Sequence, residues 1–470
     1  MRIDVPTDIP AARELGHVHF IGIGGAGLSA IARLMSQQGV VVSGSDATAS
    51  AVVAALRAEG ITCHVGHDAA HLEGVDTVIA STAVREDNPE IVEAVRRGLR
   101  LWPRSAGLRS VMQDRRTIAV AGTHGKTTTT AMLTCALVAA GAEPSFAIGA
   151  EVASLGANAR LGAGDLLIAE ADESDGAFLV YEPEGAIVTN VDADHLDNYG
   201  TIEAYAAAFD EFVGRIGRFL VLSADDAGTV ALARVARARG LDVLTAGFAE
   251  DADLRGHDLR VVGTTTTFTA SLRGVDLGPV ALEVPGAHYA LDALLALGAG
   301  LLLEQNVDLL IAGLAAYTGA NRRMQPLGEV GGVRVYDSYA HHPTEIRADL
   351  AAARAVAGDD RLVVAYQPHL VSRTRIYGVE MGQALSAADR VFVADIYLAR
   401  EDPDPAVTSA LIVDAVVGPP ATAAGPVSDL AQVLLPELRP GDLLLTLGAG
   451  DITTVGPAVL RVLESSDGPT

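Results

Sequence analysis

Lysine is almost absent from this chain of 470 residues. Lysine and arginine together number 34, and Lys126 is the single lysine, which leaves 33 arginines. A chain that otherwise uses arginine has kept one lysine between Gly125 and Thr127. A phosphate-binding loop places a compact, mobile ammonium group against the phosphates of a nucleotide, and a planar guanidinium is a poor substitute. The scarcity of lysine therefore points to Lys126 as a functional residue.

Cysteine and long apolar runs are also scarce. The two cysteines, Cys63 and Cys135, form no CxxC pair, which excludes a disulfide framework and a cysteine-based zinc site. The best apolar run, at 293–303, has about half the length that a membrane-spanning helix needs. The N-terminal residues lack the apolar core of a signal peptide, so we expect a cytoplasmic protein with no membrane partner.

Positive charge is scarce relative to negative charge. The chain carries 59 acidic and 34 basic residues, a net charge of −25 at pH 7. Nucleic acids and anionic membranes bind to basic faces, so we expect neither as a partner, although a small anion can still bind at a helix N-terminus. The apolar share of 49% indicates a globular protein, and the length allows about three domains of roughly 150 residues.

The segment around Lys126 has the features of a phosphate loop. An apolar run at 117–121 precedes it and a helical pattern at 129–137 follows. This strand-loop-helix order argues against a turn that holds a lysine by chance. In such a loop backbone N–H groups cradle phosphates and a hydroxyl binds Mg²⁺. Val120 replaces the usual first glycine, so this is a variant of the motif. The predicted ATP-binding segment comprises Gly122, Thr123, His124, Gly125, Lys126, Thr127 and Thr128.

A second glycine-rich segment follows the first predicted strand. Its glycines fit the pattern G-x-G-x-x-G, and Asp46 follows the last of them at the approximate distance of a ribose-binding acid. The glycines let backbone N–H groups approach a pyrophosphate, which a nicotinamide dinucleotide and a UDP-linked sugar both offer. The motif therefore predicts a diphosphate ligand and leaves these two open. The residues concerned are Gly22, Gly24, Gly25, Gly27 and Asp46.

Acidic clusters follow two predicted strands of the phosphate-loop block, at 170–175 and 192–197. Ligands of parallel sheets bind at the carboxyl ends of the strands, where the phosphate loop also lies. Carboxylate oxygens there suit Mg²⁺ that bridges to phosphates. Solvated acidic loops are the alternative in a chain this acidic, but both clusters end buried strands.

Strands and helices alternate along the chain in three blocks, which predicts mostly parallel sheets. We expect an α/β protein with domains at 1–110, 111–323 and 324–470. An alternating, threonine-rich pattern at 261–272 predicts an antiparallel hairpin, and the Pro, Ala and Gly content of 416–426 predicts a loop. The last few residues are expected to fray. Buried strands are expected at 17–23, 40–43, 76–80, 117–121, 165–170, 186–190, 219–223, 333–337, 361–365, 391–395 and 442–447.

The third block contributes basic and histidine side chains. Arg322 and Arg323 are adjacent, and two planar guanidinium groups suit phosphoryl oxygens. His341 and His342 precede Pro343, an arrangement that can form a site or a structural turn. The residues alone leave both readings open.

Together these motifs resemble the Mur ligase family. They occur in family order over essentially the whole chain: GIGGAG, GTHGKTTTT, EADESD, NVDADHLD, GAH, RR, YAHHPTE, and QPH followed by SRT. The resemblance implies a Rossmann-like N-terminal domain that binds a UDP-sugar and a central P-loop ATPase domain. It also implies a C-terminal Rossmann-like α/β domain that closes over the site with the amino acid.

The resemblance implies a reaction as well. ATP would phosphorylate the carboxylate of UDP-N-acetylmuramate to an acyl phosphate, which the amine of L-alanine attacks to give the amide, ADP and phosphate in peptidoglycan biosynthesis. ATP is then a co-substrate, two Mg²⁺ ions are the expected cofactors, and we expect a monomer or a weak homo-oligomer.

The same resemblance assigns roles to residues. Lys126 would hold the β- and γ-phosphates, and Arg323 would neutralise the transferred phosphoryl group. Thr127, Glu173 and His195 would bind metal, although imidazole is a soft ligand for Mg²⁺ and Glu173 fits better. The further expected contacts are Asp292 and Asp337 to ATP, Ser81 and Arg104 to the UDP-sugar, and Tyr339, His341, His342, His369, Arg373 and Arg375 on the amino-acid side.

Three positions depart from the family pattern. Tyr289 and Asp292 stand where many members carry asparagines after the Gly-x-His, and Ser338 replaces the second acid of DDYAHHP. Several members also position a second metal with a carbamylated lysine about fifteen residues after the metal-binding histidine. Here that position is Asp210. Either Asp210 or oxygens of the substrate would take that role.

Rival interpretations remain open. A recycling ligase that attaches a ready-made tripeptide to the same UDP-sugar shares most of these motifs. A nicotinamide-dependent oxidoreductase would explain the first glycine motif but leaves the phosphate loop without a role. A non-catalytic P-loop switch would explain Lys126 but not the UDP-type first domain.

Overall fold

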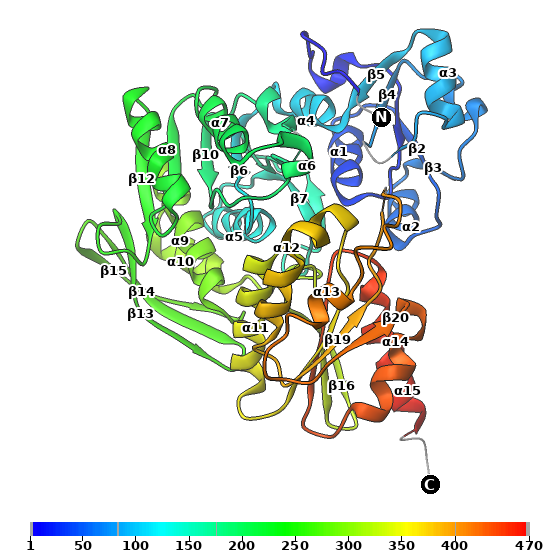
Figure 1. Cartoon of the computed structure of the whole chain (residues 1–470). Coiled ribbons are helices and arrows are strands. Elements are labelled where there is room, and N and C mark those ends of the chain that lie inside the picture. The colour runs from blue at the N-terminus through cyan, green and yellow to red at the C-terminus, as the bar shows by residue number, and fades with distance from the viewer. Residues whose placement is uncertain (1–2, 82–83, 175, 400, 467–470) are drawn as a thin grey trace. The chain divides into compact units, whose positions relative to one another are not determined.

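Figure 1 shows the computed structural model, which describes residues 3–81, 84–174, 176–399 and 401–466. Asp175 of the predicted acidic cluster and residues 467–470, which were expected to fray, lie outside the described residues. The chain divides into two compact units, which are described in turn. Unit 1 comprises Met1–Gly256, Ala270–Leu277 and Leu291–Ala316, and unit 2 comprises His257–Thr269, Gly278–Ala290 and Tyr317–Thr470.

The first sheet of unit 1 has five parallel strands in the order β3-β2-β1-β4-β5. Its central strands β1 and β4 are buried throughout, as expected for strands with helices on both faces. The strand order reverses beside β1, and ligands of such sheets bind at the carboxyl ends near that point. The strands are β1 Val18–Ile21, β2 Val42–Asp46, β3 Thr62–Val65, β4 Thr77–Ala80 and β5 Arg100–Pro103, and the helices are η1 Ala12–Glu14, α1 Ala26–Gln37, α2 Ala51–Ala58, η2 Ala69–Leu72, α3 Pro89–Arg97 and α4 Arg104–Met112.

A ten-stranded sheet follows in the order β15-β14-β13-β12-β11-β10-β6-β9-β7-β8. Strand β6 lies between β9 and β10, parallel to both, so the three carboxyl ends are adjacent. The strands are β6 Arg116–Ala121, β7 Ser145–Val152, β8 Ala157–Arg160, β9 Leu166–Glu170, β10 Gly185–Val188, β11 Phe219–Ser223, β12 Asp242–Gly247, β13 Leu254–Val262, β14 Thr265–Leu272 and β15 Val275–Leu282. The helices are α5 Lys126–Ala139, η3 Ala177–Val180, α6 Leu196–Tyr199, α7 Ile202–Val213, α8 Ala227–Ala238, α9 Ala287–Leu302 and α10 Val307–Ala315.

The third sheet lies in unit 2 and has six strands in the order β16-β17-β21-β18-β19-β20. Strand β16 is antiparallel to β17, and the other pairs are parallel. The strands are β16 Gln325–Val330, β17 Val333–Ser338, β18 Leu362–Tyr366, β19 Arg390–Ala394, β20 Ala421–Gly425 and β21 Leu443–Leu447. The helices are α11 Pro343–Ala357, α12 Val371–Leu385, α13 Ala410–Val413, α14 Val427–Leu434, η4 Leu435–Glu437, η5 Asp451–Thr454 and α15 Val455–Ser466.

The predicted fold class, an α/β protein with mostly parallel sheets, is confirmed. The hairpin expected at 261–272 corresponds to β13 and β14, which are neighbours joined by two residues, a connection that only antiparallel strands allow. The loop expected at 416–426 is confirmed for 416–420, but residues 421–425 form β20 at the sheet edge. None of its residues is fully buried and its sequence shows no strand-type alternation, so the Pro, Ala and Gly content suggested a loop there. Within the described residues, no helix is both long enough and apolar enough to span a membrane.

Candidate nucleotide-binding site

The phosphate loop of unit 1 joins β6 to α5, and two of its glycines are required by geometry. Gly122 and Gly125 have φ angles of 126° and 81°, in the left-handed region that favours glycine. A Cβ atom at Gly122 would collide with Thr189, and one at Gly125 would lie 2.7 Å from Asp292 Oδ1. Helix α5 begins at Lys126, so its first N–H groups and its dipole face the loop. The predicted anion-binding geometry is therefore present.

Lys126 lies at the centre of this loop and contacts Glu173. Its Nζ donates to the carbonyl oxygens of Gly122 at 2.6 Å and Thr123 at 3.0 Å, and lies 2.7 Å from Glu173 Oε2. Burial lowers the pKa of Lys126, but the carboxylates of Glu173 and Asp172 outweigh burial and raise it overall. Burial raises the pKa of Glu173 more than Lys126 lowers it. Glu173 thus helps to hold Lys126 charged, while the pKa of Glu173 itself stays raised, to about 7.

Residues of both acidic clusters, 170–175 and 192–197, lie around this pair. His195 has a φ of 54°, and its Nε2 lies 3.6 Å from Glu173 Oε1 and 3.7 Å from Asp194 Oδ2. Asp172 pairs with Arg104 at 2.6 Å; burial raises its pKa, but Arg104 and Lys126 lower it further, so the net pKa is lowered. The structure therefore brings Lys126, Glu173 and His195 together, as the sequence predicts.

Asp292 is also at the loop. Its Oδ1 accepts a hydrogen bond of 3.1 Å from Thr129 Oγ1, one turn into α5, and lies over Gly125. This placement puts Asp292 beside the phosphate loop, and its contact with ATP stays a prediction. The placement also explains the departure from the family pattern at this position, since a carboxylate can accept the threonine hydroxyl as an asparagine oxygen would.

The glycine-rich segment after β1 is assembled at the carboxyl end of that strand. Gly22 has a φ of 85°, and Gly25 precedes α1 as its N-cap residue. Asp46 Oδ2 accepts a hydrogen bond of 2.9 Å from Gly24 N, so it holds the loop in place. Arg104 lies against Gly27, where a Cβ would meet its Cδ at 3.0 Å. Ser81 is adjacent as well, its Cβ 3.6 Å from a Cβ placed at Gly22, so the predicted UDP-sugar residues converge.

A buried carboxylate on α3, Glu90, is surrounded by histidines beside the first sheet, and sequence reasoning did not predict it. Glu90 is fully buried and accepts hydrogen bonds from Ser45 Oγ at 2.5 Å, His67 Nδ1 at 2.9 Å and His71 Nδ1 at 2.7 Å, with His19 Nε2 at 3.5 Å. Burial raises the pKa of Glu90, but these hydrogen bonds lower it to about 2 overall. Because Ser45 precedes the loop-holding Asp46, the cluster supports the diphosphate loop.

We expect Glu90→Gln to destabilise the protein in a pH-dependent way. The pKa of Glu90 falls from 4.5 to about 2 on folding, so its stabilisation is complete above about pH 4.5 and is lost as the pH falls toward 2. The difference corresponds to about 3 kcal/mol at pH 7. Calorimetry should show a lower Tm for the variant at pH 7 and a narrowing gap below pH 4.5. Glu93→Gln, a surface change on the same helix, is the control, and an equal gap at all pH values would contradict this role.

Two residues that the sequence reasoning missed organise the phosphate loop. Asn190 follows β10; its Oδ1 accepts from His124 N at 2.9 Å and its Nδ2 donates to His124 O at 3.1 Å. Tyr205 on α7 is buried, with its hydroxyl 2.8 Å from Thr123 Oγ1 and 3.4 Å from Glu173 Oε1. The position of Asn190 beside the acidic cluster was a usable signal. No comparable signal marked Tyr205, because in the sequence it belongs to the apolar face of a helix.

Tyr205→Phe should weaken use of ATP while leaving the fold intact. The change removes one hydrogen bond to the loop threonine and a weaker one to Glu173, worth about 1–2 kcal/mol, so kcat/KM for ATP should fall about 5–30-fold. Tyr366→Phe, which removes a buried hydroxyl that bonds Met381 Sδ at 3.3 Å in unit 2, is the matched control. Unchanged ATP kinetics in Tyr205→Phe would show that the hydroxyl does not organise the loop.

Asp210 does not reach this site. It is exposed on α7, whereas Tyr205, five residues earlier, is buried and contacts Glu173. Five residues of α-helix correspond to a rotation of about 140°, so the two side chains leave the helix on different sides. The suggestion that Asp210 replaces a carbamylated lysine is therefore wrong.

In unit 2, the predicted residues form a second group at the end of β17. Arg322 and Arg323 place their guanidinium carbons 5.0 and 5.2 Å from the Tyr339 ring centre, and Tyr289 Oη donates to Arg323 O at 3.1 Å. Asp337 is buried and accepts hydrogen bonds from Thr446, Thr453 and Arg322. It therefore helps to fix the backbone at Arg322 and Arg323, which we call the arginine turn. Its predicted contact with ATP stays a prediction.

The histidines of unit 2 have mixed surroundings. His342 caps α11 in a capping box with Glu345, which is the structural-turn reading of this residue. His341 Nδ1 lies 3.0 Å from Tyr339 O. His369 Nδ1 lies 3.5 Å from Arg373, whereas Arg375 pairs with Asp404 at 2.6 Å on the surface. Their roles on the amino-acid side stay predictions.

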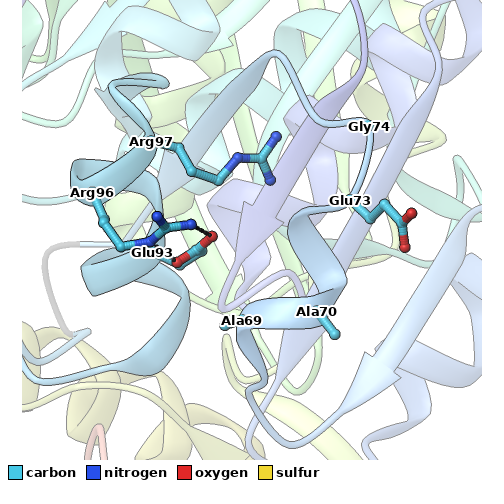
Figure 2. A pocket seen from close by; sticks show the side chains of 7 residues that line it. All are labelled: Ala69, Ala70, Glu73, Gly74, Glu93, Arg96 and Arg97. Carbon is cyan, nitrogen blue, oxygen red and sulfur yellow. Dashed lines mark hydrogen bonds and ion pairs between the residues drawn. The ribbon is translucent and has the colours of Figure 1, made fainter.

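Figure 2 shows a surface hollow in unit 1 that is lined by residues of η2, α3 and the segment after η2. None of the predicted site residues lines it. Arg96 pairs with Glu93 at 2.7 Å, and Arg97 donates to Leu72 O at 2.6 Å, so both cations are already engaged. We do not regard this hollow as the functional site.

A strand, a glycine-lysine-threonine loop, a helix and a carboxylate beside the lysine define a P-loop nucleotide-binding protein. Family models match three successive segments: "Mur ligase family, catalytic domain" at 17–116, "Mur ligase middle domain" at 120–300 and "Mur ligase, glutamate ligase domain" at 322–450. The chain belongs to the Mur ligase family.

Curated relatives and solved structures agree with this assignment. The chain is 57% identical to the UDP-N-acetylmuramate–L-alanine ligase of Nocardioides sp., over 99% of this chain and 100% of the relative, and 47% identical to that of Thermobifida fusca, over 98% and 100%. The crystal structure of the UDP-N-acetylmuramate–alanine ligase from Thermotoga maritima superposes with a TM-score of 0.83 at 29% identity, over 96% and 100%. A murein peptide ligase from Psychrobacter arcticus gives a TM-score of 0.72 at 25% identity, over 95% and 98%.

Proposed function

We propose that this chain is an ATP-dependent ligase that joins L-alanine to UDP-N-acetylmuramate through an acyl phosphate. The products are UDP-N-acetylmuramoyl-L-alanine, ADP and phosphate. Full-length similarity to curated alanine ligases, at 47–57% identity, is the observation that carries the proposal. The pair formed by Lys126 of the phosphate loop and Glu173, which follows β9, supplies the matching chemistry.

The carboxylate of the sugar is the difficult reactant, since it is anionic and has no leaving group. Transfer of the γ-phosphoryl group to it creates a phosphate leaving group. The alanine amine then attacks the acyl carbon, and the tetrahedral intermediate expels phosphate and loses a proton. In this scheme Lys126 and the first N–H groups of α5 hold the β- and γ-phosphates in line with the carboxylate. We assign Arg323 to the charge of the transferred phosphoryl group.

The donor set at the loop fits Mg²⁺. Glu173 and Thr127 are buried and offer oxygen ligands, which Mg²⁺ prefers, whereas the His195 imidazole is a weaker choice. Within the part of the chain that the structure describes, Glu173 Oε2 has no hydrogen-bond donor other than the ammonium of Lys126, so an acceptor oxygen is available to a cation. When bound, Mg²⁺ would supply charge neutralisation on the phosphates. We propose that Lys126 would then contact the nucleotide phosphates and not Glu173, so that Glu173 and Thr127 would be the residues that hold the cation.

The rival interpretations receive less support. A nicotinamide-dependent oxidoreductase does not belong to the Mur ligase family. The tripeptide-recycling ligase is a related family member, but the solved murein peptide ligase is only 25% identical to this chain. A cytoplasmic location and the three domain boundaries stay predictions, as does the oligomeric state.

Oxygen-isotope transfer tests the acyl phosphate directly. UDP-N-acetylmuramate labelled with ¹⁸O in its carboxylate should deliver one ¹⁸O to the released phosphate, because the carboxylate oxygen that attacks phosphorus leaves with it. Mass spectrometry of the phosphate from an alanine-dependent turnover reads this out. Unlabelled phosphate with labelled amide would rule out the acyl phosphate route.

A further inference from the structure

A carboxylate stands on the buried stripe of α11, where an apolar residue is expected. Ile346, Asp349, Leu350 and Ala353 share this stripe, and Asp349 is 8% exposed. A buried charge is costly unless it is paired or hydrogen-bonded, so its presence in the stripe needs an explanation.

Asp349 is hydrogen-bonded to the residue that departs from the family pattern. The hydroxyl of Ser338, the last residue of β17, donates to Asp349 Oδ2. Ser338 itself is 1% exposed. The acid that is missing from the strand at 338 thus has a counterpart on the neighbouring helix, 11 residues further along the chain.

The charges around Asp349 come from three further residues of unit 2. Burial raises its pKa to about 7 overall; Glu345 on the same helix also raises the pKa, whereas the Ser338 hydrogen bond and Arg323 lower it. His288 Nε2 lies 4.0 Å from Asp349 Oδ1, and burial together with Arg323 lowers the pKa of His288 to about 4. His288 is therefore neutral at pH 7, and Arg323 is the cation that favours the carboxylate.

The end of β17 also carries the arginine turn. Tyr339 N, next to Ser338, donates to Arg322 O at 2.8 Å, and both arginines lie over the Tyr339 ring. A hydrogen bond that fixes Ser338 consequently fixes the backbone that holds Arg323.

We propose that Asp349 is a positioning residue for Arg323: from α11 it supplies the carboxylate that the family pattern places at 338. The hydrogen bond from Ser338 to Asp349 fixes the strand end beside the arginine turn. The negative charge of Asp349 also attracts the guanidinium group of Arg323 electrostatically. The proposal rests on the proposed function, in which Arg323 meets the transferred phosphoryl group. A purely structural Asp349 would affect stability without affecting nucleotide binding.

Exchange of the two side chains tests this in the full-length protein. Asp349→Ser removes the carboxylate and Ser338→Asp adds a second one beside it, so each should lower kcat and weaken binding of Mg·ATP about 10-fold or more. The double variant Ser338→Asp/Asp349→Ser restores one carboxylate and should return both values to within about 3-fold of wild type. Asp360→Asn, an exposed acid paired with Arg334 at 2.7 Å, is the control.

The double variant decides the outcome even where a single variant does not fold. A folded double variant with near-normal kcat and Mg·ATP affinity supports the proposal. A double variant that is slow, binds ATP weakly or is unfolded overturns it, as does an Asp349→Ser protein with a lower Tm but normal kcat and ATP affinity. Calorimetry measures the ATP affinity of each variant without any ligation taking place. Absence of alanine-dependent turnover in the wild-type protein would therefore count against the proposed function alone.

Discussion

Lys126→Ala is expected to lower the rate of ligation by about 10²–10³-fold. The variant loses the cation that neutralises the β- and γ-phosphates in the transition state, and a single preorganised charge-stabilising group is worth about 3–4 kcal/mol in a site of this type. The fold should survive, because Glu173, whose pKa burial already raises, can take up a proton once the ammonium is gone. Rates of ADP release in a coupled assay measure the loss, and circular dichroism checks the fold.

Lys126→Arg should fail to restore activity. A planar guanidinium is bulkier than an ammonium group and cannot make the same contacts with the Gly122 and Thr123 carbonyls within the loop. Arg96→Ala removes an exposed cation that pairs with Glu93 and serves as the control for loss of one positive charge. Near-normal turnover of Lys126→Arg would refute the assigned role.

Glu173→Gln should reduce kcat by about 10²–10³-fold and raise the Mg²⁺ concentration needed for half-maximal rate. The substitution keeps the volume but replaces an anionic oxygen with a neutral one, which Mg²⁺ binds more weakly. Titration of the rate with Mg²⁺ at saturating ATP separates the two effects. The isosteric surface change Glu182→Gln, at an acid that pairs with Arg109, is the control. An unchanged Mg²⁺ requirement would remove Glu173 from the proposed metal site.

The parts of the site that could be predicted from the sequence are those encoded in short segments. The phosphate loop was recognisable because glycines, lysine and threonine must occupy fixed positions between one strand and one helix. The two acidic clusters could be placed because each follows a strand, and the ends of parallel neighbours meet at one edge, whereas the metal-binding roles of Glu173 and His195 came from the family resemblance. The chain-wide order of motifs then identified the family.

The remaining residues act across long sequence distances, which local patterns do not encode. The Tyr205 hydroxyl meets Thr123 from 82 residues away, and Glu90 draws its partners from β1, β2 and two other segments. Asp210, in contrast, was proposed on its spacing from His195 alone. A distance counted along the chain does not say on which side of a helix a residue lies. In the sequence Ser338 stood only as the loss of an acid from the family pattern. The structure shows that Asp349, on α11, lies within hydrogen-bonding distance of it.

Acceptor choice tests the central claim most directly. Purified protein should be supplied with UDP-N-acetylmuramate, Mg²⁺, ATP and one acceptor at a time: L-alanine, glycine, L-serine or a tripeptide. ADP release and mass spectrometry of the UDP-linked product are the readouts. The account predicts UDP-N-acetylmuramoyl-L-alanine with L-alanine and no product with the tripeptide. Glycine lacks one methyl group, worth about 1–3 kcal/mol, and should react about 10–200-fold more slowly, while L-serine, which adds a hydroxyl group, should react about 100-fold more slowly. Turnover of the tripeptide without turnover of alanine would contradict it.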